Sequence, residues 1–489
     1  MSLVLKIKHL LKHSAIYTIA TFVAKLSGLL LLPVLSNTEY MPVKDLSGYG
    51  YFIIWAGLLT NILSLGMEST IVRYLKTNSE NTVRIINSAI TIILCSICVG
   101  AFFIFSFKET ISEYGFNDPT LTHLVKFLIL HSAFDLLANL PNYYFRADEK
   151  PKTFTFYKVL RFFIEYCGII FFVVFLKWGV TGAIYGLISA SFINILIMIP
   201  FYKRFFRPIL DADLLKEMLK FGLPLLPNAV LYLLIEVSDR YFIEFARNKE
   251  VQTIYTFVYK FGGVLTVINM SFRSAWQPIM LREAQEKGNT QFFATVMTYF
   301  VVFSSILMIF ISLLALDFIR LNPIEFFQAI IADPIYYQGQ HILGFILMGY
   351  VCLGMYYNLS LGFYITKNST SMLKYTFSGF LVNLLINCFM LVYPAYAMTI
   401  ASFATFSSFF VMMFLAYRKS FEMYPVNYEF GKLVTMFSYM IFVAVIVTFF
   451  GNMSFLYKVL IAVGYIPYLF LTQTLSVTGL RQIRHIFGR

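Results

Sequence analysis

Apolar runs of about 20 residues recur along this chain from one end to the other. A helix of that length crosses a hydrocarbon core of about 30 Å. Charged residues make up only 13% of the 489 residues, against about 25% in a soluble globular protein. Such a chain cannot cover its surface in water, so much of it must lie in lipid. We predict an all-α polytopic membrane protein.

About fourteen segments have the length and hydropathy of membrane-spanning helices. They are residues 14–36, 47–67, 83–107, 121–143, 153–176, 179–202, 220–245, 251–275, 291–316, 340–365, 370–393, 395–417, 430–450 and 454–475. The first segment follows basic residues, as in a signal peptide, but its apolar part is too long and no small-residue cleavage site follows it. We therefore expect a retained first helix.

Basic residues alternate between loops in a way that gives the orientation of the chain. With the N-terminus inside, the inner loops hold clusters such as Lys203, Arg204 and Arg207, whereas the outer loops hold mostly single bases. Only the loop with Arg247 and Lys249 departs from this alternation. The positive-inside rule therefore predicts that both termini are cytoplasmic.

Several classes of protein are disfavoured by the same composition. The net charge of +13 is divided into short clusters between apolar spans, so no single basic face for nucleic acid is expected. The five cysteines fall inside apolar spans without metal-ligand spacing, which argues against both a disulfide framework and a metal site. No Gly-rich phosphate loop ending in Gly-Lys-Ser/Thr occurs. We expect no cofactor.

The chain reads as two halves of comparable size with an addition at the end. The segments "YGYFIIWAGLLTNIL" (49–63) and "YTFVYKFGGVLTVIN" (255–269) share an aromatic start, a small-Gly pair and Leu-Thr at matching offsets. Internal repeats of this kind are usual in transporters, with the substrate site between the repeats. We predict a six-helix lobe over residues 1–210, a second over 211–420, and two further helices with a basic tail over 421–489.

Lys25 lies near the middle of the first span. Burying a charge there costs at least about 2.5–3.5 kcal/mol, so it needs a partner or water. It shares one helical face with Ser14, Thr18, Thr21 and Gly28. We predict that Lys25 is a cation in a central cavity, in contact with an anion; a snorkelling or structurally paired lysine is the alternative.

Spans four and five form a predicted hairpin with four ionisable residues. Counting back from the turn places Asp135 level with Arg161, and His131 level with Glu165 about one turn deeper. We predict a mutually neutralising cluster of these four groups. It is either an ion pair that holds two helices in register, or a proton or cation site, because a histidine beside carboxylates can change charge near neutral pH.

Span seven carries Glu236, Asp239 and Arg240 in its outer third. Glu236 and Arg240 are one turn apart with the acid first, which is the favourable order for pairing. Counting from the outer turn places Glu236 level with Lys260 of span eight. We predict that these charges pair and face the mouth of a cavity between the halves; satisfied salt bridges at an interfacial helix end are the alternative.

Two prolines lie in the inner half of the same span, Pro224 and Pro227. Each removes a backbone hydrogen bond and favours a kink. We predict a hinge here, with an incidental kink as the alternative.

The stretch "FGLPLLPNAVLYLLIEVSDRYFI" (221–243) resembles span seven of the bacterial polysaccharide flippases. These belong to the multidrug/oligosaccharidyl-lipid/polysaccharide exporter superfamily and include O-antigen translocases of lipopolysaccharide synthesis. The matching positions are Phe221 to Pro224 and Ser238 to Tyr241. The inner turn "YFRADEKPKTF" and the start "KHSAIYTIATFVAKLSGLLLLPVLS" are also similar to the family. The two extra spans depart from its twelve-span form, although fourteen-span members exist.

The resemblance implies a transporter with two six-helix bundles in the bacterial cytoplasmic membrane. It implies alternating access for a polyprenyl-diphosphate-linked oligosaccharide, driven by an ion gradient of H+ or Na+, with polysaccharide polymerase or assembly proteins as possible partners. Lys25, Arg240 and Lys260 suit a diphosphate as point charges. The candidates for ion coupling are His131, Asp135, Arg161, Glu165, Glu236 and Asp239.

Three other functions are compatible with parts of the sequence. A drug exporter of the same fold needs a net acidic cavity, which Lys25 and Lys260 oppose. A polysaccharide polymerase or glycosyltransferase would be an enzyme, but the Asp-x-Asp pattern from Asp211 to Asp213 is better explained as the start of a helix. A membrane scaffold would gain little from ionisable groups inside its spans. We therefore predict a transporter with no catalytic residues.

Overall fold

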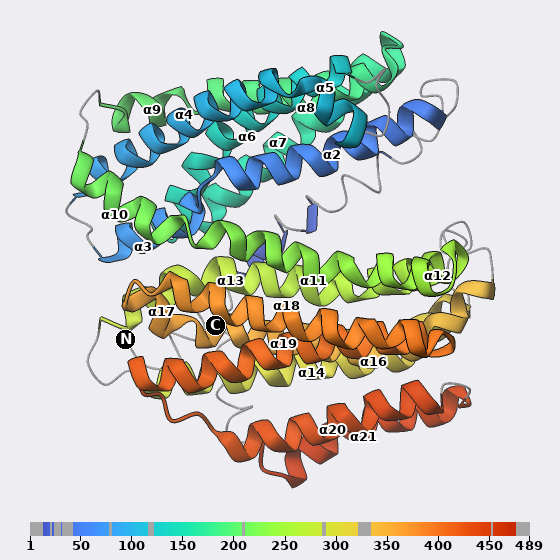
Figure 1. Cartoon of the computed structure of the whole chain (residues 1–489). Coiled ribbons are helices and arrows are strands. Elements are labelled where there is room, and N and C mark those ends of the chain that lie inside the picture. The colour runs from blue at the N-terminus through green and yellow to red at the C-terminus, as the bar shows by residue number, and fades with distance from the viewer. Residues whose placement is uncertain are drawn as a thin grey trace. The chain divides into compact units, whose positions relative to one another are not determined.

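The computed structural model describes residues 13–19, 22–23, 31, 43–77, 81–115, 122–207, 211–285, 290–320, 334–450 and 453–475 (Figure 1). Every regular element in these ranges is helical, which confirms the predicted all-α class. The described residues divide into two compact units. The N-terminal unit is His13–Pro227 with Gln277–Arg282, and the C-terminal unit is Asn228–Trp276 with the described part of Glu283–Arg489.

The N-terminal unit is built around α6 (Thr122–Ala147), which contacts α2, α3, α4, α5, α7 and α8. Because α6 packs against several helices, polar side chains along it can find partners away from lipid. The other elements are α2 (Val43–Leu63), α3 (Met67–Thr77), α4 (Thr82–Ser106), α5 (Lys108–Thr110), η2 (Ile111–Gly115), α7 (Pro151–Ile170), η4 (Phe171–Phe175), α8 (Gly179–Ile197), α9 (Ile199–Phe205) and α10 (Ala212–Gly222).

The C-terminal unit is built around α16 (Leu343–Leu359), which contacts α12, α14, α19 and α20. Helices α18 and α19 run side by side along their length (Figure 1). The other elements are α11 (Leu225–Ala246), α12 (Lys249–Tyr259), η5 (Lys260–Gly262), α13 (Gly263–Glu283), α14 (Thr290–Arg320), η6 (Pro334–Ile342), α17 (Leu361–Ile365), α18 (Ser369–Val392), η7 (Pro394–Tyr396), α19 (Ala397–Met423), α20 (Phe430–Phe449) and α21 (Phe455–Leu471).

Small residues explain how α16 packs at the centre of this unit. A Cβ added at Gly344 would lie 2.6 Å from the backbone of Ala444 in α20, and one at Gly349 would lie 3.1 Å from the backbone of Phe406 in α19. Close backbone approach at small residues is the usual way in which membrane helices associate, because lipid offers no hydrophobic driving force between them. The span that contains α16 is accordingly 89% buried.

Helices α20 and α21 are joined to α14 by polar contacts at three positions along it. Thr298 donates to Glu429 Oε2 over 2.7 Å, the hydroxyls of Ser305 and Tyr465 lie 2.8 Å apart, and Lys458 Nζ lies 2.6 Å from Asp317 Oδ2. Such contacts are favourable between membrane helices, where the alternative is a polar group in hydrocarbon. The two additional helices therefore form part of the C-terminal unit.

Nine helices of the described part of the chain are long and apolar enough to cross a membrane. The remaining predicted spans correspond to the first segment, of which little is described, to α2, to α7 with its charged residues, to the interrupted pair α12 and α13, and to the 17-residue α21. The multi-pass architecture is confirmed, while the number fourteen stays a prediction.

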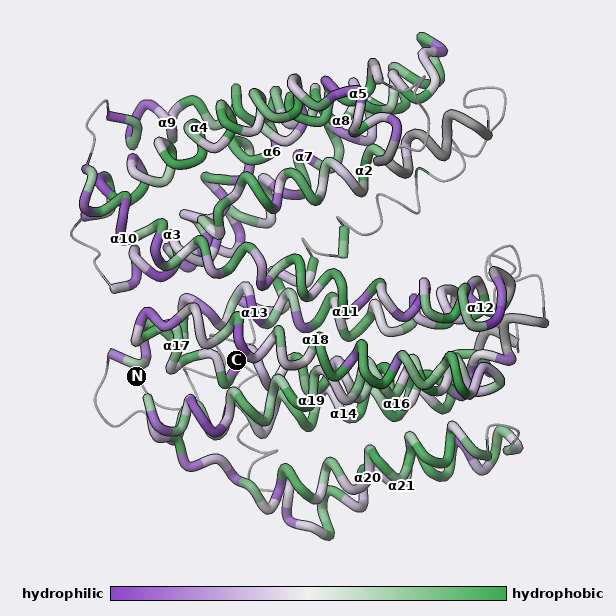
Figure 2. The backbone as a smooth tube through the Cα atoms, in the orientation of Figure 1, coloured by the Kyte–Doolittle hydropathy of each residue, from purple (hydrophilic) through white to green (hydrophobic). Residues whose placement is uncertain are grey.

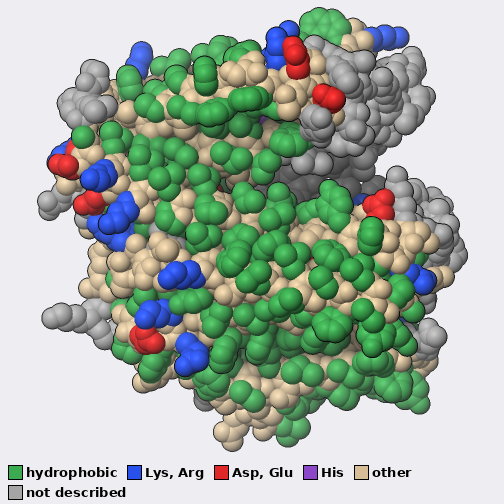
Figure 3. Space-filling model, in the orientation of Figure 1, with side chains coloured by type: hydrophobic (Ala, Val, Ile, Leu, Met, Phe, Trp, Pro, Cys, Tyr) green, Lys and Arg blue, Asp and Glu red, His purple; other side chains and the backbone are tan. Residues whose placement is uncertain are grey.

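The surface agrees with this architecture. Apolar residues occupy most of each long helix (Figure 2), and on the face shown in Figure 3 charged side chains gather near the helix ends. Helix α18 carries large apolar side chains on its exposed side: Leu385, Phe389 and Val392 are 66%, 56% and 66% exposed. Lipid is the solvent that makes such exposure favourable.

Gly66, between α2 and α3, is a position where we expect a single methyl group to matter. Its φ is +68°, and an added Cβ would lie 2.5 Å from the carbonyl oxygen of Gly222. We expect Gly66→Ala to lower the free energy of unfolding by about 1–3 kcal/mol, because it adds both backbone strain and overpacking. Gly57→Ala in α2 is the matched control, since its Cβ meets nothing within 4 Å. Equal thermal stability of the two purified variants would contradict this expectation.

Candidate functional site

In the N-terminal unit, an ion pair joins α6 to α7. Arg161 Nη2 donates to Asp135 Oδ1, as predicted by counting from the turn between the two helices. The same nitrogen lies 3.0 Å from Ser191 Oγ in α8. Nearby, Lys158 Nζ donates to Asn139 Oδ1 over 2.6 Å, one turn along α6 from Asp135. The carboxylate of Asp135 therefore has a fixed cationic partner, and its predicted pairing is confirmed.

The other two predicted members of the cluster lie close enough to interact with this pair. His131 and Glu165 each interact electrostatically with Asp135 and Arg161, although within the described residues neither forms a hydrogen bond or ion pair. The ring of His131 packs against Phe52, with centroids 5.9 Å apart, and its Nδ1 is buried without a hydrogen-bond partner. Equal depth on two helices did not bring His131 and Glu165 into direct contact, because depth fixes the height of a residue but not the direction in which it points. Their role in ion coupling stays a prediction.

The turn after α6 holds a second polar network in this unit. Arg146 pairs with Glu68 of α3, and its Nη2 donates to Gln277 Oε1 over 3.2 Å. Glu149 accepts from Lys76 Nζ over 2.7 Å and also pairs with Arg282. The arginine and the glutamate of the sequence motif "YFRADEK" therefore each bind two partners, and these contacts hold neighbouring helices together.

In the C-terminal unit, Asp239 is buried with no exposed surface, and each of its oxygens accepts two hydrogen bonds. Oδ1 accepts from the amide nitrogens of Asn387 (2.7 Å) and Asn383 (3.3 Å) in α18. Oδ2 accepts from the hydroxyls of Thr405 (2.7 Å) in α19 and Tyr255 (2.9 Å) in α12. Four helices therefore converge on one carboxylate.

All four donors to Asp239 are neutral. Within the described part of the chain, no lysine, arginine or histidine forms an ion pair with it, in contrast to Asp135. A buried charge is costly unless it is paired, and the four hydrogen bonds leave the net negative charge of this carboxylate to be balanced by a proton or a bound cation. Asn387 Oδ1 is also buried without a partner. Oxygen atoms around a single negative charge suit a hard monovalent cation, whereas Ca²⁺ and Mg²⁺ sites usually use more carboxylates.

Arg240, the next residue of α11, is directed to different partners. Its guanidinium lies over the ring of Tyr259, 5.4 Å from the centroid, and its Nε is buried without a hydrogen-bond partner. The hydroxyl of Tyr350 lies 2.9 Å from that of Tyr259 and 3.3 Å from Glu236 Oε1. This leaves Arg240 as a half-buried cation with unused donors, held by an aromatic face.

The other predicted cations have less definite surroundings. Lys25 lies outside the described residues. Lys260 is exposed at the start of the 3₁₀ turn η5. Neither Arg240 nor Lys260 forms an ion pair within the described ranges, so the predicted pairings of Glu236 with these two residues are wrong. Stacking on Tyr259, which sequence spacing did not reveal, takes the place of the first pairing.

The helix is interrupted at Pro224, as predicted, whereas Pro227 lies in the first turn of the helix that follows. Helix α10 ends at Gly222 and α11 begins at Leu225, with Pro224 in the break. The boundary between the compact units falls directly after Pro227. The break is confirmed, and the function of these residues as a hinge stays a prediction.

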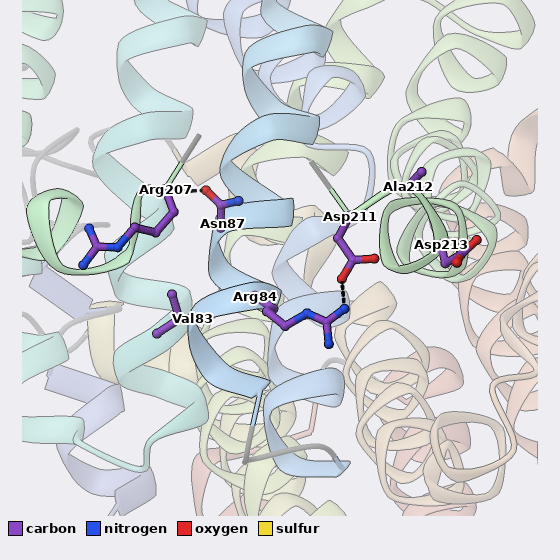
Figure 4. A pocket seen from close by; sticks show the side chains of 7 residues that line it. All are labelled: Val83, Arg84, Asn87, Arg207, Asp211, Ala212 and Asp213. Atoms are coloured by element: carbon purple, nitrogen blue, oxygen red, sulfur yellow. Dashed lines mark hydrogen bonds and ion pairs between the residues drawn. The ribbon is translucent and has the colours of Figure 1, made fainter. Parts of the chain in front are cut away.

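A cavity of about 360 Å³ lies beside the Asp-x-Asp pattern, lined by Arg84, Asn87, Arg207, Asp211 and others (Figure 4). Several of its polar groups form hydrogen bonds or ion pairs with one another or with the backbone nearby. Asp211 caps α10 by accepting from the Leu214 backbone N–H at 3.2 Å and pairs with Arg84, and Asn87 Oδ1 accepts from the Arg207 backbone N–H at 2.9 Å. The helix-start interpretation of Asp211 is confirmed, and these contacts fix a connection between helices.

Sequence reasoning identified Asp239 but missed the residues around it. Asn383 and Asn387 are one turn apart on an apolar helix, and this pair of amides was a signal that could have been used. Thr405 and Tyr255 carried no comparable signal. Within the described residues no group of three or more His, Cys, Asp or Glu side chains gathers as a metal site would require.

Comparison with known proteins gives both a family and a fold. The sequence matches the family described as polysaccharide biosynthesis protein over residues 10–283, more than half of the chain. No curated protein matches it. Among solved structures, a transporter of the multidrug/oligosaccharidyl-lipid/polysaccharide exporter (MOP) superfamily from Pyrococcus furiosus is similar, with a TM-score of 0.68 at 16% identity over 84% of this chain and 94% of that one.

Two structures of MATE transporters agree with this fold. The Vibrio cholerae MATE transporter VcmN, in a mutant form, has a TM-score of 0.72 at 13% identity over 85% of this chain and 97% of its own. An outward-facing multidrug resistance MATE transporter of the MOP superfamily has a TM-score of 0.68 at 14% identity, with 86% and 97% covered. The chain belongs to the polysaccharide biosynthesis protein family, and its multi-pass fold is similar to that of transporters of the MOP superfamily.

Proposed function

We propose that the protein is a flippase. It translocates a polyprenyl-diphosphate-linked oligosaccharide across the bacterial cytoplasmic membrane by alternating access, coupled to a monovalent cation, H+ or Na+. Membership of a polysaccharide biosynthesis family supports the class of substrate, and the transporter fold supports translocation. In this proposal both termini are cytoplasmic, and polymerase or assembly proteins of polysaccharide synthesis are partners.

The observation that carries the proposal is the buried carboxylate of Asp239. It lies among four neutral donors, and the oxygen of Asn387 beside it has no partner. A permanent ion pair would leave nothing for a coupling ion to do, but this arrangement leaves one charge to be balanced. We assign cation coupling to Asp239. Asp135 has Arg161 as a partner, and its role in this scheme is to hold α6 and α7 in register.

The diphosphate is assigned to Arg240, with Lys25 and Lys260 as further cations. A guanidinium suits phosphate because it donates several N–H groups in one plane. The Tyr259 ring stacks against Arg240, so binding costs less side-chain entropy than it would for a free arginine. No covalent chemistry is required, since translocation needs only fixed charges that replace the water around the headgroup.

Reconstitution in liposomes tests this function directly. A fluorescent polyprenyl-diphosphate oligosaccharide is placed in both leaflets, and its accessibility to a membrane-impermeant quencher or reductant is followed. We expect equilibration to be accelerated by the protein and to depend on a Na+ or pH gradient. Transport of organic drug cations with no effect on the lipid-linked sugar would assign the protein to drug export.

Replacing Arg240 tests the assignment of the headgroup site. We expect Arg240→Gln to weaken transport of the lipid diphosphate about 10- to 100-fold, because a charged hydrogen bond contributes about 1.5–3 kcal/mol. Arg247→Gln is the matched control, because Arg247 is an exposed arginine just beyond the end of the same helix. Equal transport rates for the two variants would remove Arg240 from the headgroup site.

A further inference from the structure

One short helix contacts both charges of the proposed site. In α12, the Tyr255 O–H donates to Asp239 Oδ2 over 2.9 Å, and the Tyr259 ring lies against the guanidinium of Arg240. Asp239 and Arg240 are consecutive in α11, whereas the two tyrosines are one turn apart and share a face of α12. A movement of α12 that alters one contact therefore alters the other.

Helix α12 is also the element around Asp239 that is best placed to move. The other three donors belong to α18 and α19, which are 24 and 27 residues long and pack against each other. Helix α12 has 11 residues and ends directly in the 3₁₀ turn Lys260–Gly262. A 3₁₀ segment within a longer helical stretch often marks a hinge. Gly263 follows it, with open space around its Cβ position.

Tyr259 is held in place by two other tyrosines, Tyr255 and Tyr350. Tyr255 and Tyr259 are buried, and their ring centroids are 5.6 Å apart. The Tyr350 hydroxyl of α16 lies 2.9 Å from the hydroxyl of Tyr259. The Tyr259 ring is held at its hydroxyl by Tyr350 and lies against the guanidinium of Arg240. A tilt of α12 therefore changes the position of this guanidinium relative to a ligand.

On the basis of the proposed function, we infer that Tyr255 and Tyr259 are positioning residues that couple the cation at Asp239 to the diphosphate at Arg240. A cation bound at the carboxylate competes with the Tyr255 O–H for the same lone pairs and so shifts α12, which carries the Tyr259 ring and the guanidinium stacked on it. It also neutralises the charge next to Arg240. Neutralisation favours an anion at Arg240, and the shifted Tyr259 ring presents the guanidinium to that anion, so the two ligands bind with positive cooperativity, and the coupling is reciprocal.

Binding measurements in lipid nanodiscs test this inference, with Na+ as the cation and farnesyl diphosphate as the lipid diphosphate. The readout is the ratio of diphosphate dissociation constants without and with saturating Na+. We expect a ratio of at least about fivefold for the wild type, within the usual range of such couplings. A second arm without Na+ measures the ratio on lowering the pH, which identifies H+ as the cation if only that arm responds.

Variants of Tyr259 distinguish positioning from folding. Tyr259→Leu removes the ring, and we expect a ratio below about twofold with the Na+ affinity unchanged, because no ligand at Asp239 is lost. Tyr259→Phe keeps the ring and should retain most of the ratio, as a rescue by the conservative variant. Tyr465→Phe is the matched control: it removes another buried hydroxyl, the partner of Ser305 in the same unit, and should leave the ratio at the wild-type value.

The outcomes separate the inference from the function on which it rests. If Tyr259→Leu kept the wild-type ratio of diphosphate dissociation constants, the inference would be overturned. The coupling would then be a direct effect of charge between Asp239 and Arg240. Binding of both ligands to the wild type with a ratio of one would also overturn it, while leaving the function intact. If the wild type binds neither ligand, the proposed function fails and the inference fails with it.

Discussion

Replacing Asp239 by asparagine is expected to lower the affinity for the coupling cation at least about 100-fold. Loss of a residue that only supports a metal ligand commonly costs about 10–100-fold, and Asp239→Asn removes the one carboxylate of the proposed site while preserving its size. Direct binding of radioactive Na+ to protein in nanodiscs measures the loss. For H+ as the cation, the same variant should lose the pH dependence of lipid-diphosphate transport.

Stability measurements give Asp239→Asn a second, independent readout. A cation that binds only the folded protein stabilises it by about 2.7 kcal/mol at about 100 times its dissociation constant, so Na+ should raise the unfolding temperature of the wild type but not of the variant. Without a cation, the variant should be at least as stable as the wild type, because an unpaired buried charge has been removed. Asp213→Asn, at an exposed position in the first turn of α10, is the control. An unchanged cation response in Asp239→Asn would end the assignment.

Lys458→Met is expected to destabilise the protein by about 3–5 kcal/mol, because it leaves a buried carboxylate without its cation. The side chains of Lys458 and Asp317 are only 4% and 12% exposed, and Nζ lies 2.6 Å from Oδ2. The pair joins α21 to α14, so its loss should separate the two additional helices from the rest of the C-terminal unit first. Unfolding in mixed detergent, followed by circular dichroism and by limited proteolysis between α19 and α20, measures both effects.

Two matched variants test the cause of that loss. The double variant Lys458→Met with Asp317→Leu should recover most of the stability, because replacing a whole buried pair by apolar side chains is often neutral. Lys432→Met disrupts the pair with Glu429 at the start of α20, where the side chains are 37% and 39% exposed, and should cost no more than about 1 kcal/mol. Similar losses for Lys458→Met and Lys432→Met would show that burial is not the cause.

The sequence determined the features that depend on neighbours along the chain. Length and hydropathy placed the membrane helices, because a helix must satisfy its own backbone in lipid. Counting residues from one turn paired Asp135 with Arg161. This works because the depth of a residue in each of two consecutive antiparallel helices can be counted from the turn that joins them. Asp211 was recognisable as the start of α10 for the same local reason.

Only the tertiary structure decided which groups meet across distant helices. Depth alone placed His131 level with Glu165, but in the structure the His131 ring packs against Phe52. Asp239 receives donors from Asn383, Asn387 and Thr405, which are 144, 148 and 166 positions away in the chain. The rotation of each helix about its axis, and the helices against which it packs, depend on small and large side chains along its whole length. A short stretch of sequence therefore does not predict which distant residues come into contact.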